Sequence, residues 1–296
     1  PEADVVMMAL TGKAGLEATL AALRAGKAVA LSDKEVIVMA GGLVMRTAAD
    51  HGALVLPVDS EPSAIWQCIQ GEAQPLRRLI ITASGGPFRT KALSEIAAVT
   101  PEQALRHPTW VMGRKITIDS STLMNKGFEV IESRWLFDVP YERIEVVVHP
   151  QSVVHSFVEL ADGSVKAQMG PPDMRLPIQY ALTHPERLQS PVIPRYDPLA
   201  FPSLTFEPLA PARYPCFATA LAAGRAGGTH PAVLSAADEE AVHLFLGGRI
   251  SFGDIPALVA GVVERHEGWA DDSAEAVLAA DEWARAQVAE RVGSAR

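Results

Sequence analysis

The chain has 296 residues, of which 48% are hydrophobic and 21% are charged, so it can bury a sizeable core. This composition excludes a disordered tail, a collagen-like fibre and a long coiled coil. The formal net charge of −9 argues against nucleic acid as a partner, because duplex binding needs a basic face. No apolar run reaches the roughly 18 residues of a membrane span, so we expect no membrane partner either.

The first part of the chain alternates short apolar runs with helical patterns. We expect strands at 5–10, 28–31 and 54–58 and helices at 14–25 and 33–50. This order predicts a parallel α/β sheet. No G-x-G-x-x-G loop follows the first strand, although nucleotide-binding sheets usually carry one there. We therefore expect residues 1–59 to be a partial Rossmann-like domain whose N-terminal part is missing.

The middle of the chain, residues 60–183, mixes helices with strands that turn back on themselves. The pattern predicts helices at 62–70 and 120–137, strands at 79–83, 116–118 and 144–149, and a hairpin turning at 161–164. Hairpins imply antiparallel strands, so we expect an α+β domain.

The last part of the chain divides into a proline-rich stretch and a helical region. Residues 184–214 carry many prolines and little periodicity, which is typical of a linker. Residues 215–296 show helical patterns at 215–226, 231–247, 253–266 and 272–292, which predict a small helical bundle. The two cysteines, Cys68 and Cys216, indicate neither a disulfide framework nor a zinc cluster.

Two carboxylates follow the predicted strand at 54–58. Asp59 and Glu61 flank Ser60, and alternate residues of an extended segment face the same side. Ligands gather at the carboxyl ends of parallel strands, and paired carboxylates there suit Mg²⁺ or Mn²⁺. The alternative is that Asp59 and Ser60 only cap the next helix, with Glu61 solvated.

A second polar group spans the predicted strand at 116–118 and the helix after it. Ser120 stands where that helix should begin, and Asn125, Lys126 and Glu129 share one helical face. A helix N-terminus with such side chains suits a phosphate, and the carboxylate could hold a metal beside it. A capping serine with an exposed Lys–Glu pair explains the same spacing equally well.

Two loops add weaker signals. Ser84 opens a Gly-Gly-Pro turn that could approach an anion or be only a turn. The 107–113 loop carries Trp110 and Met112, which suits either a lid over a substrate or a loop pinned to the core. His149 and His155 are expected to be structural.

Together these motifs resemble the 1-deoxy-D-xylulose 5-phosphate reductoisomerase family over almost the whole chain. The matching strings, in family order, are PVDSE (57–61), SGGPFR (84–89), HPTWVMGRK (107–115), MNKGFE (124–129), HPQS (149–152) and PDMR (172–175). The resemblance implies NADPH-dependent conversion of 1-deoxy-D-xylulose 5-phosphate into 2-C-methyl-D-erythritol 4-phosphate, with Mn²⁺, Mg²⁺ or Co²⁺. It also implies a homodimer in a bacterial cytoplasm or a plastid.

The resemblance assigns roles residue by residue. It implies metal ligands at Asp59, Glu61 and Glu129, and catalytic roles for Lys34, Glu61, His107 and Glu129. It implies substrate contacts at Ser60, Glu61, Ser84, His107, Trp110, Ser120, Asn125, Lys126 and Glu129. It implies cofactor contacts at Asp33, Lys34, Glu35, Gly113 and Met174. Asp33 stands where many members have Asn, so it brings an added negative charge near the cofactor, which either weakens cofactor binding or has no effect.

Two other functions stay open. A metal-dependent sugar-phosphate isomerase or aldolase without nicotinamide would use the same carboxylates and anion site. A catalytically incomplete fragment would bind ligand without turnover.

Overall fold

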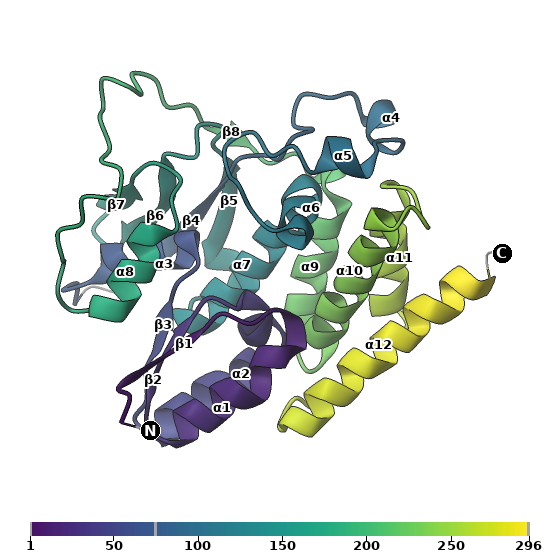
Figure 1. Cartoon of the computed structure of the whole chain (residues 1–296), viewed down its shortest axis with the longest axis horizontal. Helices are drawn as coiled ribbons and strands as arrows, with labels where there is room; N and C mark the ends of the chain where they lie inside the picture. The colour runs from purple at the N-terminus through teal and green to yellow at the C-terminus, as the bar shows by residue number, and fades with distance from the viewer. Residues whose placement is uncertain (1, 74–75, 295–296) are drawn as a thin grey trace.

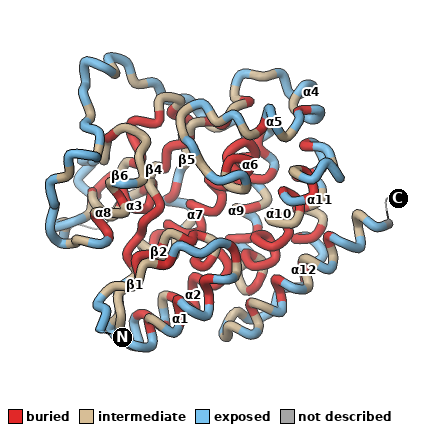
Figure 2. The backbone as a smooth tube through the Cα atoms, viewed as in Figure 1, coloured by how far each residue is buried: buried red, intermediate tan, exposed pale blue. Residues whose placement is uncertain are grey.

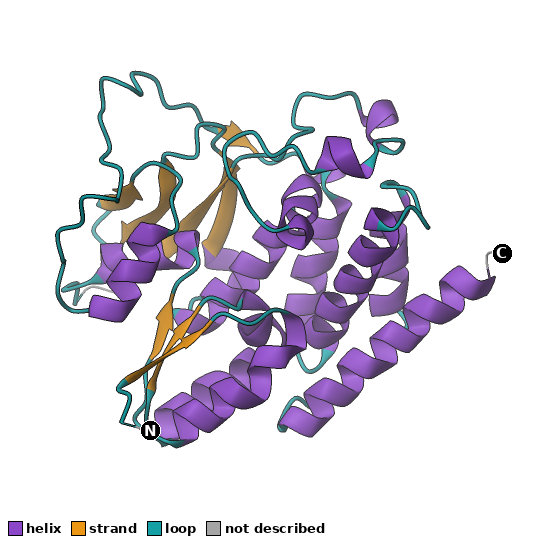
Figure 3. Cartoon of the chain, viewed as in Figure 1, coloured by secondary structure: helices purple, strands orange, loops and turns teal. Residues whose placement is uncertain are grey.

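The computed structural model describes residues 2–73 and 76–294. Two sheets lie beside a group of helices formed mainly by the C-terminal part of the chain (Figures 1 and 3). Buried backbone is concentrated where the sheets meet these helices (Figure 2).

The first sheet is parallel, as expected. Its strands β1 (Val5–Met8), β2 (Ala28–Leu31) and β3 (Val55–Pro57) pair in the order β1-β2-β3. A 3-10 turn η1 (Gly12–Gly15) leads into α1 (Leu16–Arg24), and α2 (Lys34–Asp50) connects β2 to β3. The side chains that follow β2 and β3 therefore leave the sheet at the same edge.

The second sheet is mixed. Its order is β7-β6-β4-β5-β8, with bounds β4 (Leu76–Ala83), β5 (Ile144–Val148), β6 (Val154–Leu160), β7 (Val165–Met169) and β8 (Glu207–Pro208). β4 and β5 are parallel, and the other pairs are antiparallel, which confirms the hairpin. Helix α3 (Ser60–Ile69) packs on β6 and β7, and α8 (Arg175–Thr183) lies next to α3.

The predicted strand at 116–118 is wrong. Helix α6 (Arg114–Thr122) occupies this segment, and α7 (Met124–Leu136) follows after Leu123, whose φ of 56° breaks the helix. The β-branched residues favoured a strand, but Thr117 and Ser121 donate their hydroxyl hydrogens to carbonyls four residues back, and α6 packs on α7 and α10. Ser120 therefore lies in the last turn of α6 and does not begin a helix.

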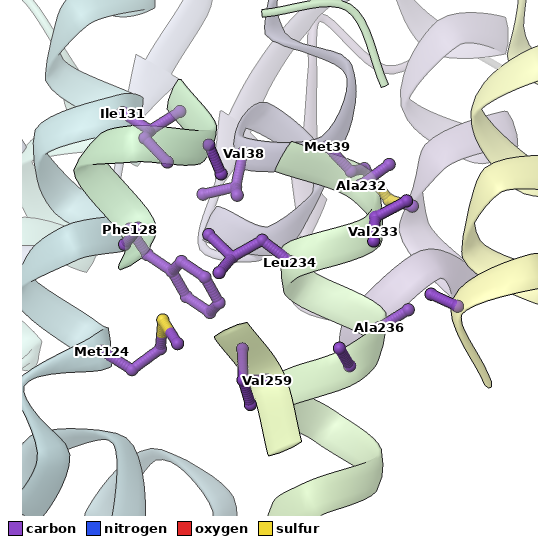
Figure 4. Close-up of a cluster of buried hydrophobic side chains, with 14 of the residues drawn as sticks. Val38, Met39, Met124, Phe128, Ile131, Ala232, Val233, Leu234, Ala236 and Val259 are labelled. Atoms are coloured by element: carbon purple, nitrogen blue, oxygen red, sulfur yellow. The ribbon is translucent and has the colours of Figure 1, made fainter. Parts of the chain in front are cut away.

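The C-terminal helices match the prediction. They are α9 (Pro215–Ala226), α10 (His230–Leu246), α11 (Asp254–Val263) and α12 (Ala274–Ser294), and α12 runs along the outer side (Figure 1). Their apolar faces share one core with α2 and α7, where Val38, Phe128, Leu234 and Val259 meet (Figure 4). Phe128 is fully buried at its centre.

The remaining segments are short or irregular. They contain α4 (Leu93–Ile96), α5 (Pro101–Ala104), η2 (Tyr141–Arg143) and η3 (Pro211–Arg213). The proline-rich stretch 184–214 is mostly exposed but contributes β8 to the second sheet. The division of the chain into four parts proposed from the sequence stays a prediction. In the described part of the chain no helix is both long and apolar enough to cross a bilayer.

Candidate active site

A cavity of about 270 Å³ opens at the carboxyl ends of β2, β3 and β4. Lys34 comes soon after β2, Asp59 soon after β3, and Ser84 directly after β4. The lining includes thirteen of the side chains named in the sequence analysis as candidate site residues. These are Lys34, Asp59, Ser60, Glu61, Ser84, His107, Trp110, Met112, Ser120, Asn125, Lys126, Glu129 and Met174. The strand-end rule was applied to Asp59 and Glu61, and both carboxylates line this cavity.

Three carboxylates converge on one wall of this cavity. Asp59, Glu61 and Glu129 each offer an oxygen, and these oxygens all lie within 4.8 Å of one another. Glu129 is fully buried, and the other two are each 8% exposed. In the described residues this is the one such group of three or more potential metal ligands.

The local structure differs from the extended segment expected at Asp59 and Glu61. Asp59 is the N-cap of α3 and accepts a hydrogen bond from the Ser60 amide at 3.1 Å, while Glu61 lies in the first helical turn. The cap and the acidic cluster therefore coexist, because Asp59 Oδ1 accepts the hydrogen bond from the Ser60 amide while Oδ2 contacts Lys34. Glu61 is buried, so the alternative of a solvated Glu61 is wrong.

Two lysines neutralise part of this cluster. The Lys34 ammonium lies 2.5 Å from Asp59 and 3.3 Å from Glu129, and it donates to the Asn125 side-chain oxygen at 2.7 Å. The Lys126 ammonium lies 2.5 Å from Glu61 and 2.6 Å from Glu129. The exposed Lys–Glu pair considered for the sequence is therefore wrong, because both Lys126 and Glu129 are buried.

A fourth carboxylate, Glu132, leaves the cluster short of positive charge. Glu132 is fully buried, and neither of its oxygens has a hydrogen-bond partner among the described residues. Four carboxylates against two ammonium groups leave two negative charges, which a divalent cation would balance. Oxygen ligands in a buried acidic site suit Mg²⁺ or Mn²⁺, so the residues present fit such an ion.

The pKa values reflect the same imbalance. Burial, followed by the charge of Glu61, raises the pKa of Glu129 to about 7. Burial, followed by Asp59, raises the pKa of Glu132 well above its ordinary value. Burial opposes ionisation of Glu61 too, but contact with Lys126 lowers its pKa to about 2. Without a cation, protons on Glu129 and Glu132 take its place.

A second group of side chains that line the cavity is neutral and forms hydrogen bonds. His107 Nε2 lies 3.1 Å from Ser84 Oγ and 3.0 Å from Ser120 Oγ. Its Nδ1 accepts hydrogen bonds from the amides of Thr109 and Trp110. Burial, together with the charge of Lys126, lowers the pKa of His107 to about 4, so the ring is neutral with its hydrogen on Nε2.

A glycine turn brings Ser84 close to α6. Gly86 has a φ of +69°, and its amide donates to Ser84 Oγ at 3.2 Å. A Cβ added at Gly86 would lie 2.7 Å from the Ser120 carbonyl oxygen. A glycine is therefore required both by the backbone conformation and by the close approach to α6.

The 107–113 loop covers the cavity. Trp110 and Met112 line it, and Thr109 Oγ1 lies 3.3 Å from Ser152 Oγ. The Trp110 ring lies 6.1 Å from the ring of His155, while Val111 is fully exposed. The loop is thus both attached at its aromatic residue and exposed at its tip. Its role as a moving lid stays a prediction.

A second cavity of about 470 Å³ lies next to the first and shares Lys34 and Asn125 with it. Four of the residues predicted to contact a cofactor line it: Asp33, Lys34, Glu35 and Gly113. The fifth, Met174, lines the first cavity. The two cavities together therefore bring all five close to the acidic cluster.

Asp33 does not carry the added negative charge expected from the sequence. It is 2% exposed. Burial, followed by the charge of Glu35, raises the pKa of Asp33 to about 8. The side chain is therefore mostly neutral at pH 7.

Several polar residues at the site were not predicted. Glu132 is three residues after Glu129 on α7, so the helical spacing could have revealed it. His155 lines the cavity, whereas His149 bonds the Thr205 carbonyl and the amides of Val153 and Val154. No pattern in the sequence distinguishes these two histidines.

Known proteins resemble this chain along its length. A 1-deoxy-D-xylulose 5-phosphate reductoisomerase family model matches residues 1–41, and two models of the C-terminal domains of that enzyme match residues 55–137 and 169–287. The 1-deoxy-D-xylulose 5-phosphate reductoisomerase of Heliobacterium modesticaldum is 56% identical over all of this chain and 75% of its own length. That of a Synechococcus strain is 54% identical over 98% of this chain and 74% of its own.

Solved structures agree. The reductoisomerase of Zymomonas mobilis in complex with NADPH is 47% identical with a TM-score of 0.91, covering 98% of this chain and 75% of that one. A DOX-P reductoisomerase in complex with NADPH, fosmidomycin and magnesium is 40% identical with a TM-score of 0.90, covering 99% and 76%. This chain thus spans about three quarters of the length of these proteins.

Proposed function

Because the chain belongs to the 1-deoxy-D-xylulose 5-phosphate reductoisomerase family, we propose that it isomerises and reduces 1-deoxy-D-xylulose 5-phosphate to 2-C-methyl-D-erythritol 4-phosphate with NADPH and a divalent cation. The observation that carries this proposal is one cavity lined both by a buried acidic cluster and by a group of neutral donors. A phosphosugar offers matching chemistry, with oxygens for a metal and a phosphate for the donors.

Asp59, Glu61 and Glu129 would hold the cation. When bound, a divalent cation polarises carbonyl and hydroxyl oxygens as a Lewis acid, which favours rearrangement of the carbon skeleton. Lys34 and Lys126 keep the carboxylates together, because each ammonium contacts two of the three. Ser60 donates its hydroxyl hydrogen to Glu61 at 2.5 Å and so orients that carboxylate toward the cavity.

The neutral side chains of the cavity would bind the phosphate, and the 107–113 loop would cover the substrate. Ser84, Ser120 and the neutral His107 present hydroxyl and ring N–H groups. Asn125 and Lys126, which contact the acidic cluster, would add an amide and a charge from that side. Trp110 lies over the cavity and would exclude water from the bound substrate. Phosphate recognition here thus depends on side chains and not on the N-terminus of α6.

NADPH would approach from the second cavity. Asp33, Lys34, Glu35 and Gly113 line that cavity, and Met174 lies on the wall of the first. Structures of two relatives are described as complexes with NADPH, and one of these also with fosmidomycin and magnesium. We expect fosmidomycin to bind this protein and to compete with the substrate.

The test is NADPH oxidation by the purified protein with 1-deoxy-D-xylulose 5-phosphate and Mg²⁺, with the product identified by mass spectrometry. The proposal predicts oxidation that stops with EDTA or fosmidomycin and yields 2-C-methyl-D-erythritol 4-phosphate. Rearrangement without NADPH oxidation would instead support the nicotinamide-independent isomerase or aldolase. Binding of substrate or fosmidomycin without turnover would support a chain that only binds ligand.

A homodimer in a bacterial cytoplasm is also part of this proposal. Its support is the family resemblance and the bacterial relatives named above. Sedimentation equilibrium of the purified protein tests the dimer, and a monomer at micromolar concentration would contradict it.

A further inference from the structure

Lys115 contacts three carboxylates outside the acidic cluster of the active site. Its ammonium lies 2.8 Å from Asp119, 3.1 Å from Asp238 and 3.2 Å from Glu35. Asp119 and Asp238 are almost completely buried. In the described part of the chain, Lys115 is the one cation that forms an ion pair with any of these three carboxylates.

These contacts join elements on both sides of the active site. Glu35 lies in the first turn of α2, Lys115 and Asp119 lie on α6, and Asp238 lies on α10. The ammonium also lies 4.8 Å from the centre of the Phe128 ring on α7. One side chain therefore connects four helices, and Lys115, Glu35 and Asp119 also line the second cavity.

The residues joined by Lys115 are direct neighbours of active-site residues. Glu35 follows Lys34, which contacts two carboxylates of the acidic cluster. Asp119 precedes Ser120, which lies beside His107. Lys115 lies two residues after Gly113, which is the last residue of the 107–113 loop and the N-cap of α6.

Loss of the ammonium would leave three converging carboxylates without a counter-charge. Burial opposes the charge on Lys115, but Asp119, Asp238 and Glu35 raise its pKa well above the ordinary value, so it is charged. Unpaired like charges in a buried site repel or take up protons. Burial already raises the pKa of Asp119 well above its ordinary value and raises that of Asp238, so these groups would take up protons. The contact that ties Glu35 of α2 to α6 and α10 would then be lost, and the helix ends would no longer be held together.

We propose that Lys115 is a positioning residue for the reaction: by holding Glu35 of α2 against Asp119 of α6 and Asp238 of α10, it sets the distance between Lys34 at the metal end and Ser120 at the phosphate end. This inference rests on the proposed function for its kinetic consequences. Its structural consequence, the placement of Lys34 against Asp59 and Glu129, affects cation binding with or without turnover.

The test compares Lys115→Met, which keeps the stem and removes the charge, with Lys115→Arg, which restores it. Lys115→Met should lower kcat/KM by about 10- to 100-fold, as expected for a small displacement of reacting groups. The Kd for Mg²⁺, measured by calorimetry on metal-free protein, should rise about tenfold. Lys115→Arg should recover most of the Mg²⁺ affinity, because the guanidinium keeps the charge.

A second variant separates positioning from folding. Glu35→Gln breaks the link to α2 and leaves Lys115 between two aspartates, so it should fold like the wild type. Because Glu35 also lines the second cavity, the readout is the Mg²⁺ Kd measured without NADPH, which should still rise about threefold or more. The matched control is Lys166→Met, which removes an ion pair with Glu72. Lys166 lines neither of the two cavities. This control should leave the Mg²⁺ Kd unchanged.

The outcomes separate this inference from the proposed function. The inference is overturned if Lys115→Met and Glu35→Gln both keep the wild-type Mg²⁺ affinity and kinetics. It is also overturned if the activity of these variants falls no more than their fraction of folded protein. If the wild type shows no turnover, the proposed function fails. The Mg²⁺ titrations then decide the inference by themselves.

Discussion

Replacing Glu129 with glutamine should stabilise the metal-free protein and abolish its metal-dependent activity. Glu129 is fully buried between Lys34 and Lys126, and it also accepts a hydrogen bond from Asn125 at 2.5 Å. Glutamine keeps the shape and removes the charge. The two consequences have opposite signs, so together they distinguish a ligand site from an ordinary buried ion pair.

The magnitude follows from the pKa of Glu129. Burial and the charge of Glu61 raise this pKa from 4.5 to about 7 in the folded protein. Between these values the folded state holds a proton that the unfolded state has lost, so the stability falls as the pH rises through this range. At about 1.4 kcal/mol for each pH unit, the loss reaches about 3 kcal/mol above pH 7.

The assay is urea denaturation with EDTA between about pH 5 and pH 8, for the wild type and for Glu129→Gln. The variant should gain up to about 3 kcal/mol over the wild type at the alkaline end, and the difference should shrink toward pH 5. Added Mg²⁺ should stabilise the wild type and not the variant. NADPH oxidation by the variant should fall by about a hundredfold or more.

Two results would refute this reasoning. One is a variant that is less stable than the metal-free wild type at alkaline pH, which would mean that the ionised Glu129 is a net stabilising partner of the lysines. The other is a variant that keeps its activation by Mg²⁺, which would remove Glu129 from the metal site.

Three further predictions concern single positions. Gly86→Ala should destabilise the protein by about 1–3 kcal/mol in urea denaturation and raise the KM for substrate, because the added Cβ meets the Ser120 carbonyl at a φ of +69°; wild-type values for both would contradict the close approach. Asp33→Asn should change kcat/KM less than about threefold at pH 7, since Asp33 is mostly protonated there, with the difference growing above pH 8; a large effect at pH 7 would mean a charged Asp33. His107→Gln should raise the KM for substrate about tenfold, because a hydrogen bond is lost. The pH profile of the wild-type kcat/KM should show no inflection from His107 above about pH 5. An inflection near pH 6.5 that disappears in the variant would contradict a neutral ring.

Much of the site could be predicted because it follows simple spacing rules. The end of β3 brought Asp59 into the cavity, and the i,i+4 and i,i+3 spacings on α7 correctly placed Asn125, Lys126 and Glu129 on one face. These rules depend only on the strand and helix periods. The alternation expected for an extended segment does not apply to Glu61, which reaches the cavity from the first turn of α3.

Other features depend on packing between distant segments. The β-branched run at Ile116–Ile118 favours a strand locally, but contacts with α7 and α10 stabilise a helix there. The ion pair between Lys115 and Asp238 joins α6 to α10, and no spacing within one element indicates it. The neutral state of Asp33 likewise follows from burial, which the sequence does not display.

The most direct test of the metal site is anomalous diffraction from crystals of this protein soaked in Mn²⁺. The account predicts a manganese peak within coordination distance of oxygens from Asp59, Glu61 and Glu129, and no such peak in Glu129→Gln crystals soaked in the same way. A manganese peak elsewhere, with none among these three carboxylates, would contradict it.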